Sequence, residues 1–119
     1  RLRANPTRRL SVGKRGAEEG RTGKRVGIYD EDEQLQWLAR KGEQHGFRVV
    51  QAAVSRDAKI IEKNAIERQG THHDVTLLSV QFDGILQVTD PALLLHAVEA
   101  GIGSAKGFGF GLLSLAPVT

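Results

Sequence analysis

Two capped helices set among short apolar runs constrain the fold of this chain more than any other feature. Asp30 precedes the first helix and a glutamate follows three residues later, which is the spacing of a capping box. Apolar residues recur on one face of this segment, and Gly46 is a suitable left-handed terminator. Asp90 caps the second helix, Pro91 occupies its first position and Gly101 ends it.

Short apolar runs around these helices predict strands. They cover residues 26–29, 47–54 and 112–115. Residues 1–10 alternate loosely between apolar and basic side chains, which predicts a short strand that Asn5-Pro6 ends, because proline cannot donate to a sheet ladder. The dipeptide Asp83-Gly84 suits a type I′ turn, so the apolar runs beside it predict a β-hairpin over residues 75–89. The resulting order, β–α–β–β–α–β with decorations, predicts an α+β, ferredoxin-like (RRM-like) domain.

Positive charge is concentrated ahead of the first helix. Residues 1–25 contain nine Lys and Arg against two Glu, a net +7, whereas residues 26–119 contain eight against twelve acidic residues, a net −4. Residues 11–25 contain four glycines and no apolar periodicity, which predicts a mobile basic loop. Residues 1–29 thus form a basic strand and loop arm, and the asymmetry favours a polyanionic partner such as nucleic acid. A solubilising arm without a partner would have the same composition.

The segment from Gly101 to Gly111 contains five glycines in eleven residues, together with Ser104 and Lys106. An ordered glycine costs about 0.5–1 kcal/mol relative to alanine, so this segment requires positive φ angles or close backbone approach. It follows a helix rather than a strand, which excludes a dinucleotide fingerprint, and no Ser or Thr follows Lys106 as in a Walker loop. We interpret it as a run of backbone donors with one cation, suited to phosphates. Composition alone equally allows a packing turn. Phe108 and Phe110 could stack on bases, but we expect them to fill the core beneath the loop.

No catalytic or metal-binding constellation can be assembled from the sequence. The absence of cysteine excludes disulfides, thiolate metal sites and Cys nucleophiles. The four histidines lack metal-ligand spacing and are expected mostly in exposed loops, and the acidic run 30–33 suits a helix N-terminus. We therefore predict no catalytic residue, metal or cofactor. The sequence contains no run of about 18 apolar residues, so we expect no membrane span. A cytoplasmic location fits this composition. The start without Met suggests a fragment of a longer protein.

Four blocks of the sequence resemble one family in the same order. They are RLRANPTRRL with the following GKR, QWLARKG, VQFDGILQVTDP and GIGSAKGFGFGLLSLAP. Together they are similar to the CasE family, the CRISPR RNA-processing endoribonucleases of type I-E systems. The resemblance implies two ferredoxin-like domains in tandem, of which residues 1–119 match the C-terminal, RNA-binding one. It also implies metal-independent cleavage at the base of a CRISPR repeat hairpin, with the guide RNA retained among other Cascade subunits.

The resemblance also implies which residues contact RNA. The family's catalytic His and Tyr lie in its N-terminal domain, which no stretch of this sequence resembles, so no catalytic residue is carried over. A basic helix and a basic hairpin of this domain face the repeat stem, and a dispersed cationic surface suits double-stranded RNA. The expected RNA-binding residues are Arg40, Lys41, Lys63, Arg68, Gly101, Gly103, Ser104, Lys106, Gly107 and Gly109. The polar residues 55–74, which contain Lys63 and Arg68, predict a protruding hairpin or loop.

Two other functions remain open from the sequence. The chain could be an assembly module whose main contacts are protein subunits of Cascade. It could also be a stand-alone RNA-recognition domain without nuclease ancestry.

Overall fold

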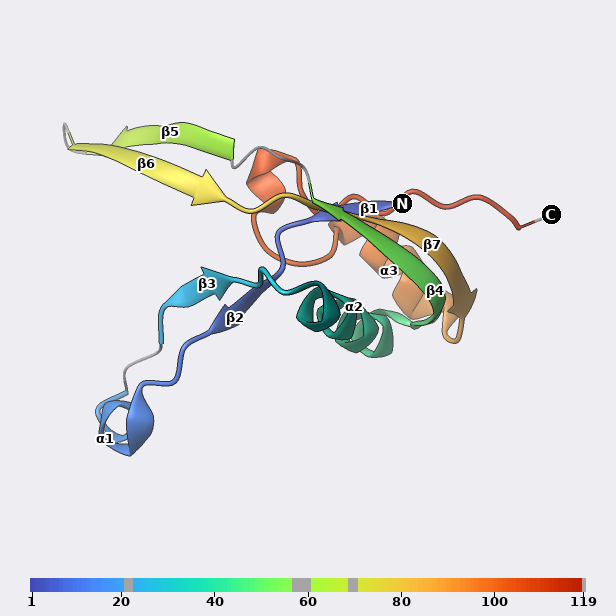
Figure 1. The fold of residues 1–119 in the computed structure, drawn as a ribbon, viewed down its shortest axis with the longest axis horizontal. Coiled ribbons are helices and arrows are strands. Elements are labelled where there is room, and N and C mark those ends of the chain that lie inside the picture. Colours follow the sequence, from blue (N-terminus) through green and yellow to red (C-terminus); the bar gives the residue numbers. More distant parts are fainter. Residues whose placement is uncertain (21–22, 57–60, 69–70, 119) are drawn as a thin grey trace.

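The computed structural model describes residues 1–20, 23–56, 61–68 and 71–118, without the side chains of residues 56–76 and Phe108. Figure 1 shows the chain as a compact body of helices and strands from which two β-ribbons project. The elements in chain order are β1 (Leu2–Ala4), β2 (Thr7–Arg9), α1 (Gly13–Glu18), β3 (Arg25–Gly27), α2 (Glu31–His45), β4 (Phe47–Arg56), β5 (Ile61–Arg68), β6 (Thr71–Leu77), β7 (Val80–Val88), α3 (Pro91–Ala100) and the 3₁₀ turn η1 (Lys106–Phe108).

The central sheet is antiparallel, with the strand order β1-β7-β4. Leu113 extends it by an antiparallel bridge to Leu2 on the free side of β1. Counting this bridge as the last strand, α2 and α3 connect the strands in the predicted β–α–β–β–α–β order. The domain is therefore α+β and ferredoxin-like, as predicted. The final strand, predicted over residues 112–115, is reduced to this single bridge.

One core lies between the sheet and the two helices. Strand alternation directs Leu2, Val80 and Phe82 toward the helices, where each is at most 3% exposed. Leu94 of α3 joins the same cluster, and Trp37 of α2 stacks on Phe82 with ring centroids 5.9 Å apart. Each such side chain contributes about 1.5–3 kcal/mol on burial, so this core fixes where α2 sits on the sheet.

The helix ends match the sequence predictions. The Asp30 side chain accepts a hydrogen bond from the Glu33 amide at 3.0 Å, and Gly46 ends α2 with φ 80°. Asp90 accepts hydrogen bonds from the first amides of α3, and Gly101 follows that helix with φ 85°. Both caps are confirmed.

The predicted hairpin turn at Asp83-Gly84 is wrong. β7 continues through both residues, and Gly84 pairs with Ala52 next to an irregularity between Val49 and Gln51 in β4. A Cβ atom at Gly84 would lie 2.0 Å from the Gln51 carbonyl oxygen. The glycine therefore permits close approach of two strands, a use that the dipeptide signal for a turn cannot distinguish.

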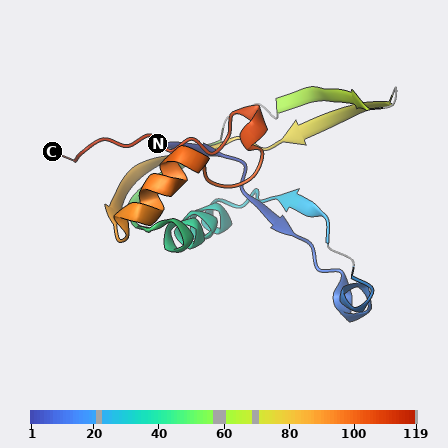
Figure 2. The same ribbon diagram turned by 180° about the vertical axis from the view of Figure 1, so that it is seen from behind.

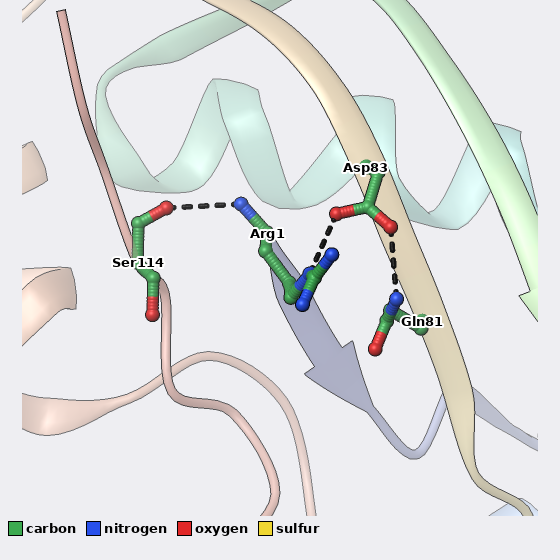
Figure 3. Close-up of polar contacts among 4 residues, drawn as sticks. All are labelled: Arg1, Gln81, Asp83 and Ser114. Atoms are coloured by element: carbon green, nitrogen blue, oxygen red, sulfur yellow. Dashed lines mark hydrogen bonds and ion pairs between the residues drawn. The ribbon is translucent and has the colours of Figure 1, made fainter.

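Arg1 packs beside Asp83, where this turn was expected. Figure 3 shows Asp83 accepting hydrogen bonds from the Arg1 Nε and Gln81 Nε2 atoms, each at 2.8 Å. The main-chain nitrogen of Arg1 donates to the Ser114 carbonyl oxygen at 2.9 Å, and the Ser114 amide donates to the Arg1 carbonyl oxygen at 2.9 Å. These bonds hold the segment after Leu113 against β1.

Two ribbons project from the body (Figures 1 and 2). β2 and β3 form an antiparallel pair that carries α1 at its tip, so the segment 11–25, predicted as a mobile loop, contains a short helix instead. β5 and β6 form the second antiparallel pair, which agrees with the predicted protruding hairpin over residues 55–74. The predicted short strand over residues 26–29 is present as β3.

Candidate nucleic-acid interface

A cleft with cationic walls lies where three distant segments of the chain meet. Its volume is about 380 Å³. α2 supplies one wall, the loop after α3 supplies the second, and the β2–β3 ribbon supplies the third. The lining residues are Thr7, Arg25, Trp37, Lys41, Gln44, His45, Gly103, Ser104 and Lys106. We call this feature the cationic cleft.

The α2 wall has a regular spacing. Trp37, Lys41 and His45 follow one another at four-residue intervals, which places them on one face of the helix. Trp37 is 4% exposed and forms the base of this wall. The Lys41 Nζ atom lies 5.7 Å from the Trp37 ring centroid and donates to the Gln44 Oε1 atom at 3.4 Å. The cation–π contact holds the lysine along the wall.

Positive charges in the cleft act on one another. Burial lowers the pKa of the Lys41 ammonium, and the charges of Arg25, Lys106 and Arg40 lower this pKa further. Burial also lowers the pKa of the His45 imidazole, and the charges of Lys41 and Lys106 lower this pKa further. No lining residue is acidic, and no carboxylate among the described residues forms an ion pair with Arg25, Lys41 or Lys106. An anion bound here would relieve this repulsion.

The inner half of the glycine-rich loop, by which we mean Gly103, Ser104 and Gly111, packs against the body. Gly103 has φ 86°, and a Cβ atom there would lie 3.0 Å from Trp37 Cζ2. The Ser104 hydroxyl donates to the Asn5 carbonyl oxygen at 3.0 Å and accepts from Asn5 Nδ2 at 3.2 Å. A Cβ atom at Gly111 would lie 2.6 Å from the Ile102 carbonyl oxygen. This half has the packing role that composition left open.

The outer half of the loop, residues 106–109, has open space beside its glycines. Gly107 and Gly109 would have no atom within 4 Å of an added Cβ, and Gly109 has φ 87°. Lys106 begins the turn η1 and is exposed, while a Cβ atom at Gly101 would lie 3.5 Å from its Cδ and Cε atoms. The stem of Lys106 thus lies along Gly101, and Lys106 is one of the residues that line the cleft. Phe110, 4% exposed, fills the core as expected, and the side chain of Phe108 lies outside the description.

The predicted RNA-binding residues divide into three groups. Lys41, Gly103, Ser104 and Lys106 line the cleft. Gly101, Gly107, Gly109 and the exposed Arg40 are not among its lining residues. Lys63 and Arg68 belong to β5 in the separate β5–β6 ribbon, and their side chains lie outside the described part of the structure.

Sequence reasoning missed two titratable side chains of the cleft. Arg25 was counted only within the basic arm, yet its guanidinium donates to the Thr7 hydroxyl at 2.8 Å and lines the cleft. His45 was expected in an exposed loop, but it is half-buried in the last turn of α2. The four-residue spacing from Trp37 could have placed His45 beside Lys41, whereas no local signal places Arg25 there.

The sheet face opposite the helices offers a different surface. Strand alternation directs Arg3, Arg48, Gln81, Asp83 and Gln87 to this face. No aromatic residue lies among the described positions of this face. RNA-recognition sheets stack bases on aromatic side chains, so the described face lacks that mode of binding. The cationic cleft on the helix side is the better candidate.

Other kinds of site lack support in the described residues. They contain no group of three or more His, Cys, Asp or Glu that could hold a metal ion. No helix among the described segments is long and apolar enough to span a membrane.

Comparison with known proteins supports the resemblance read from the sequence. A family model described as "CRISPR associated protein" matches residues 1–117. The chain is 36% identical over 123 residues to the CRISPR-associated endoribonuclease Cse3 of Thermus thermophilus, covering 98% of this chain and 54% of that protein. It is 37% identical over 120 residues to the Cascade subunit CasE of Escherichia coli, covering 99% of this chain and 57% of that protein.

A solved structure agrees with these relationships. The structure of the CRISPR endoribonuclease Cse3 bound to a 19-nucleotide RNA has a TM-score of 0.78 and 31% sequence identity to this chain. The match covers 98% of this chain and 54% of that one, so the chain spans about half the length of these relatives. Because the family model covers nearly the whole sequence, the chain belongs to the family of CRISPR-associated proteins that includes Cse3 and CasE.

Proposed function

We propose that the chain is the RNA-binding half of a CRISPR precursor-RNA processing endoribonuclease. On this proposal it binds the repeat hairpin and acts with other Cascade subunits in the cytoplasm. The support is its family, together with relatives described as a CRISPR endoribonuclease and a Cascade subunit. One structural relative is described as bound to RNA. Residues 1–119 correspond on this proposal to the C-terminal domain of a tandem pair.

The observation that carries the proposal is the cationic cleft with the open outer half of the glycine-rich loop. Lys41 and Lys106 face the cleft from different segments, and exposed Arg40 adds charge beside them. The loop adds the backbone around Gly107 and Gly109, which has open space on its side. Backbone amides and cations together suit phosphate oxygens. Binding through phosphates and shape is the usual mode for double-stranded RNA.

The proposal assigns binding, not cleavage, to this half. Neither a catalytic residue nor a metal is assigned to it, and its histidine in the cleft is surrounded by cations. We propose that the groups that transfer protons belong to the other half of the relatives' length. The chain alone should then bind hairpin RNA without cleaving it.

A direct test measures binding of the chain to a labelled CRISPR repeat hairpin by fluorescence anisotropy. Lys41→Gln and Lys106→Gln should each weaken binding about tenfold, or about 1.4 kcal/mol. Arg48→Gln is the matched control, since this exposed arginine lies on the opposite sheet face and bonds to Gln87 at 2.6 Å. The proposal fails if the wild-type chain shows no affinity for the hairpin at low salt.

A second candidate function is an assembly module for Cascade proteins. It is favoured by exposed apolar side chains on α3, where Leu93 is 44% and Leu95 is 60% exposed. Exposed apolar surface is what protein contacts bury. This candidate predicts that Leu95→Ser abolishes binding to purified Cascade subunits while the chain has no measurable affinity for RNA. Strong hairpin binding by the isolated chain would refute it as the main function.

A further inference from the structure

The cationic cleft differs from a general basic surface in how its cations are held. The Arg25 guanidinium is oriented by its bond to the Thr7 hydroxyl at 2.8 Å. Lys41 is held over the buried Trp37 ring, and the stem of Lys106 lies along Gly101. Three cations from three segments are thus arranged before a ligand arrives, which reduces the ordering cost of binding.

The neutral groups of the cleft extend this arrangement. Gln44 provides an amide and His45 provides an imidazole on the same wall. The lowered pKa of His45 leaves the imidazole neutral at pH 7, so one ring nitrogen can still donate a hydrogen bond. A tetrahedral anion accepts bonds on every oxygen, and fixed donors converging from several sides match that need.

The indole of Trp37 has no open face for a base. One face of Trp37 is stacked against Phe82 with an interplanar angle of 15°, and Lys41 lies over the ring. Gly103 packs against its edge, where an added Cβ atom would lie 3.0 Å from Cζ2. At 4% exposure the indole is part of the core. Stacking on an indole, a usual way to hold an unpaired base, is therefore closed at Trp37.

From these observations we infer that the cationic cleft is a pocket for one phosphate group, and that it binds the phosphate without reading the attached base. Arg25, Lys41 and Lys106 supply the charge, and the His45 imidazole supplies a neutral donor. The inference deepens the proposed function and rests on it in one respect, namely that the phosphate belongs to bound RNA. It adds Arg25 and His45 to the residues expected to contact RNA.

The pocket is tested with small ligands by amide chemical-shift titration of the full chain. Inorganic phosphate and adenosine monophosphate should shift the amides of residues 41–46 and 103–107 in a saturable manner, and adenosine should leave them unchanged. Lys106→Gln and Arg25→Gln should each weaken phosphate binding at least fivefold, whereas Arg48→Gln should leave it unchanged. Equal shifts with adenosine, shifts that grow without saturation, or an equal loss in Arg48→Gln would each overturn the inference.

Hairpin RNA separates this inference from the proposed function. If the RNA binds tightly but phosphate produces no saturable shift in the cleft, the pocket is wrong and the proposed function stands. If phosphate saturates the cleft but hairpin RNA binds no more tightly than adenosine monophosphate, the pocket stands and the proposed function is wrong. The amide spectrum of each variant, recorded before titration, reports whether the variant is folded.

Discussion

The glycine-rich loop allows a matched comparison between packing and open backbone. Gly103 has φ 86° and faces the Trp37 ring at 3.0 Å from an added Cβ atom, whereas Gly109 has φ 87° and faces open space. Gly107 has neither a positive φ nor a neighbour within 4 Å. Alanine at these three sites therefore separates the cost of backbone conformation from the cost of a collision.

The magnitudes follow from these two terms. A left-handed residue other than glycine costs about 1–2 kcal/mol, and overpacking a buried contact costs about 1–3 kcal/mol. We expect Gly103→Ala to lower the free energy of unfolding by about 2–5 kcal/mol and Gly109→Ala by about 1–2 kcal/mol. Gly107→Ala should be neutral or stabilising by up to about 1 kcal/mol, because alanine reduces the entropy of the unfolded chain.

Urea unfolding followed by Trp37 fluorescence measures these differences. The midpoint should fall in the order Gly107→Ala, Gly109→Ala, Gly103→Ala with an unchanged dependence on urea. Trp37→Phe shortens the ring at the contact, so the double variant with Gly103→Ala, followed by circular dichroism, should lose less than the sum of the two single changes. Equal costs at Gly103 and Gly109 would refute the packing role of the inner half of the loop.

Four further changes test the fold and the cleft. Asp90→Ala should lower stability by about 1 kcal/mol through loss of the α3 cap, measured by urea unfolding. Gly84→Ala should cost about 3 kcal/mol or more in the same assay, because the added Cβ atom would lie 2.0 Å from a carbonyl oxygen of β4. The hydrogen bond from Arg1 lowers the pKa of Asp83 below its usual 3.8. The stability that ionised Asp83 contributes is therefore present above that pH and is lost as the pH falls through the lowered value. Asp83→Asn should flatten the dependence of unfolding on pH in this acidic range. Sulfate keeps a constant charge between about pH 5 and 8 and should bind more tightly at the acidic end of this range. A bound anion favours the protonated form of His45, against the burial and the charges of Lys41, Lys106 and His96 that lower its pKa. The same pH dependence in His45→Gln would contradict this role.

Local signals in the sequence predicted the elements that depend on local chemistry. Asp30 and Asp90 cap their helices because a short acidic side chain reaches the free amides of the first turn. Gly46 ends α2 in the left-handed conformation that glycine allows. The ferredoxin-like order followed from these boundaries and from the apolar runs between them.

The errors and omissions depend on long-range contacts. Gly84 resembles a turn residue, but its role is set by the main chain of β4, which is distant in sequence. Arg25 joins the cleft only because the β2–β3 ribbon lies next to α2 and the glycine-rich loop. The division of that loop into packed and open halves depends on the position of Trp37. None of these neighbours can be deduced from the local sequence pattern.

The salt dependence of hairpin RNA binding tests the central claim most directly. Each neutralised phosphate contributes about 0.7–0.9 to the slope of log affinity against log salt concentration. If Lys41 and Lys106 each contact a phosphate, the double variant Lys41→Gln/Lys106→Gln should reduce that slope by about 1.4–1.8, and Arg48→Gln should leave it unchanged. A double variant with the wild-type slope and affinity would show that RNA does not bind at the cationic cleft.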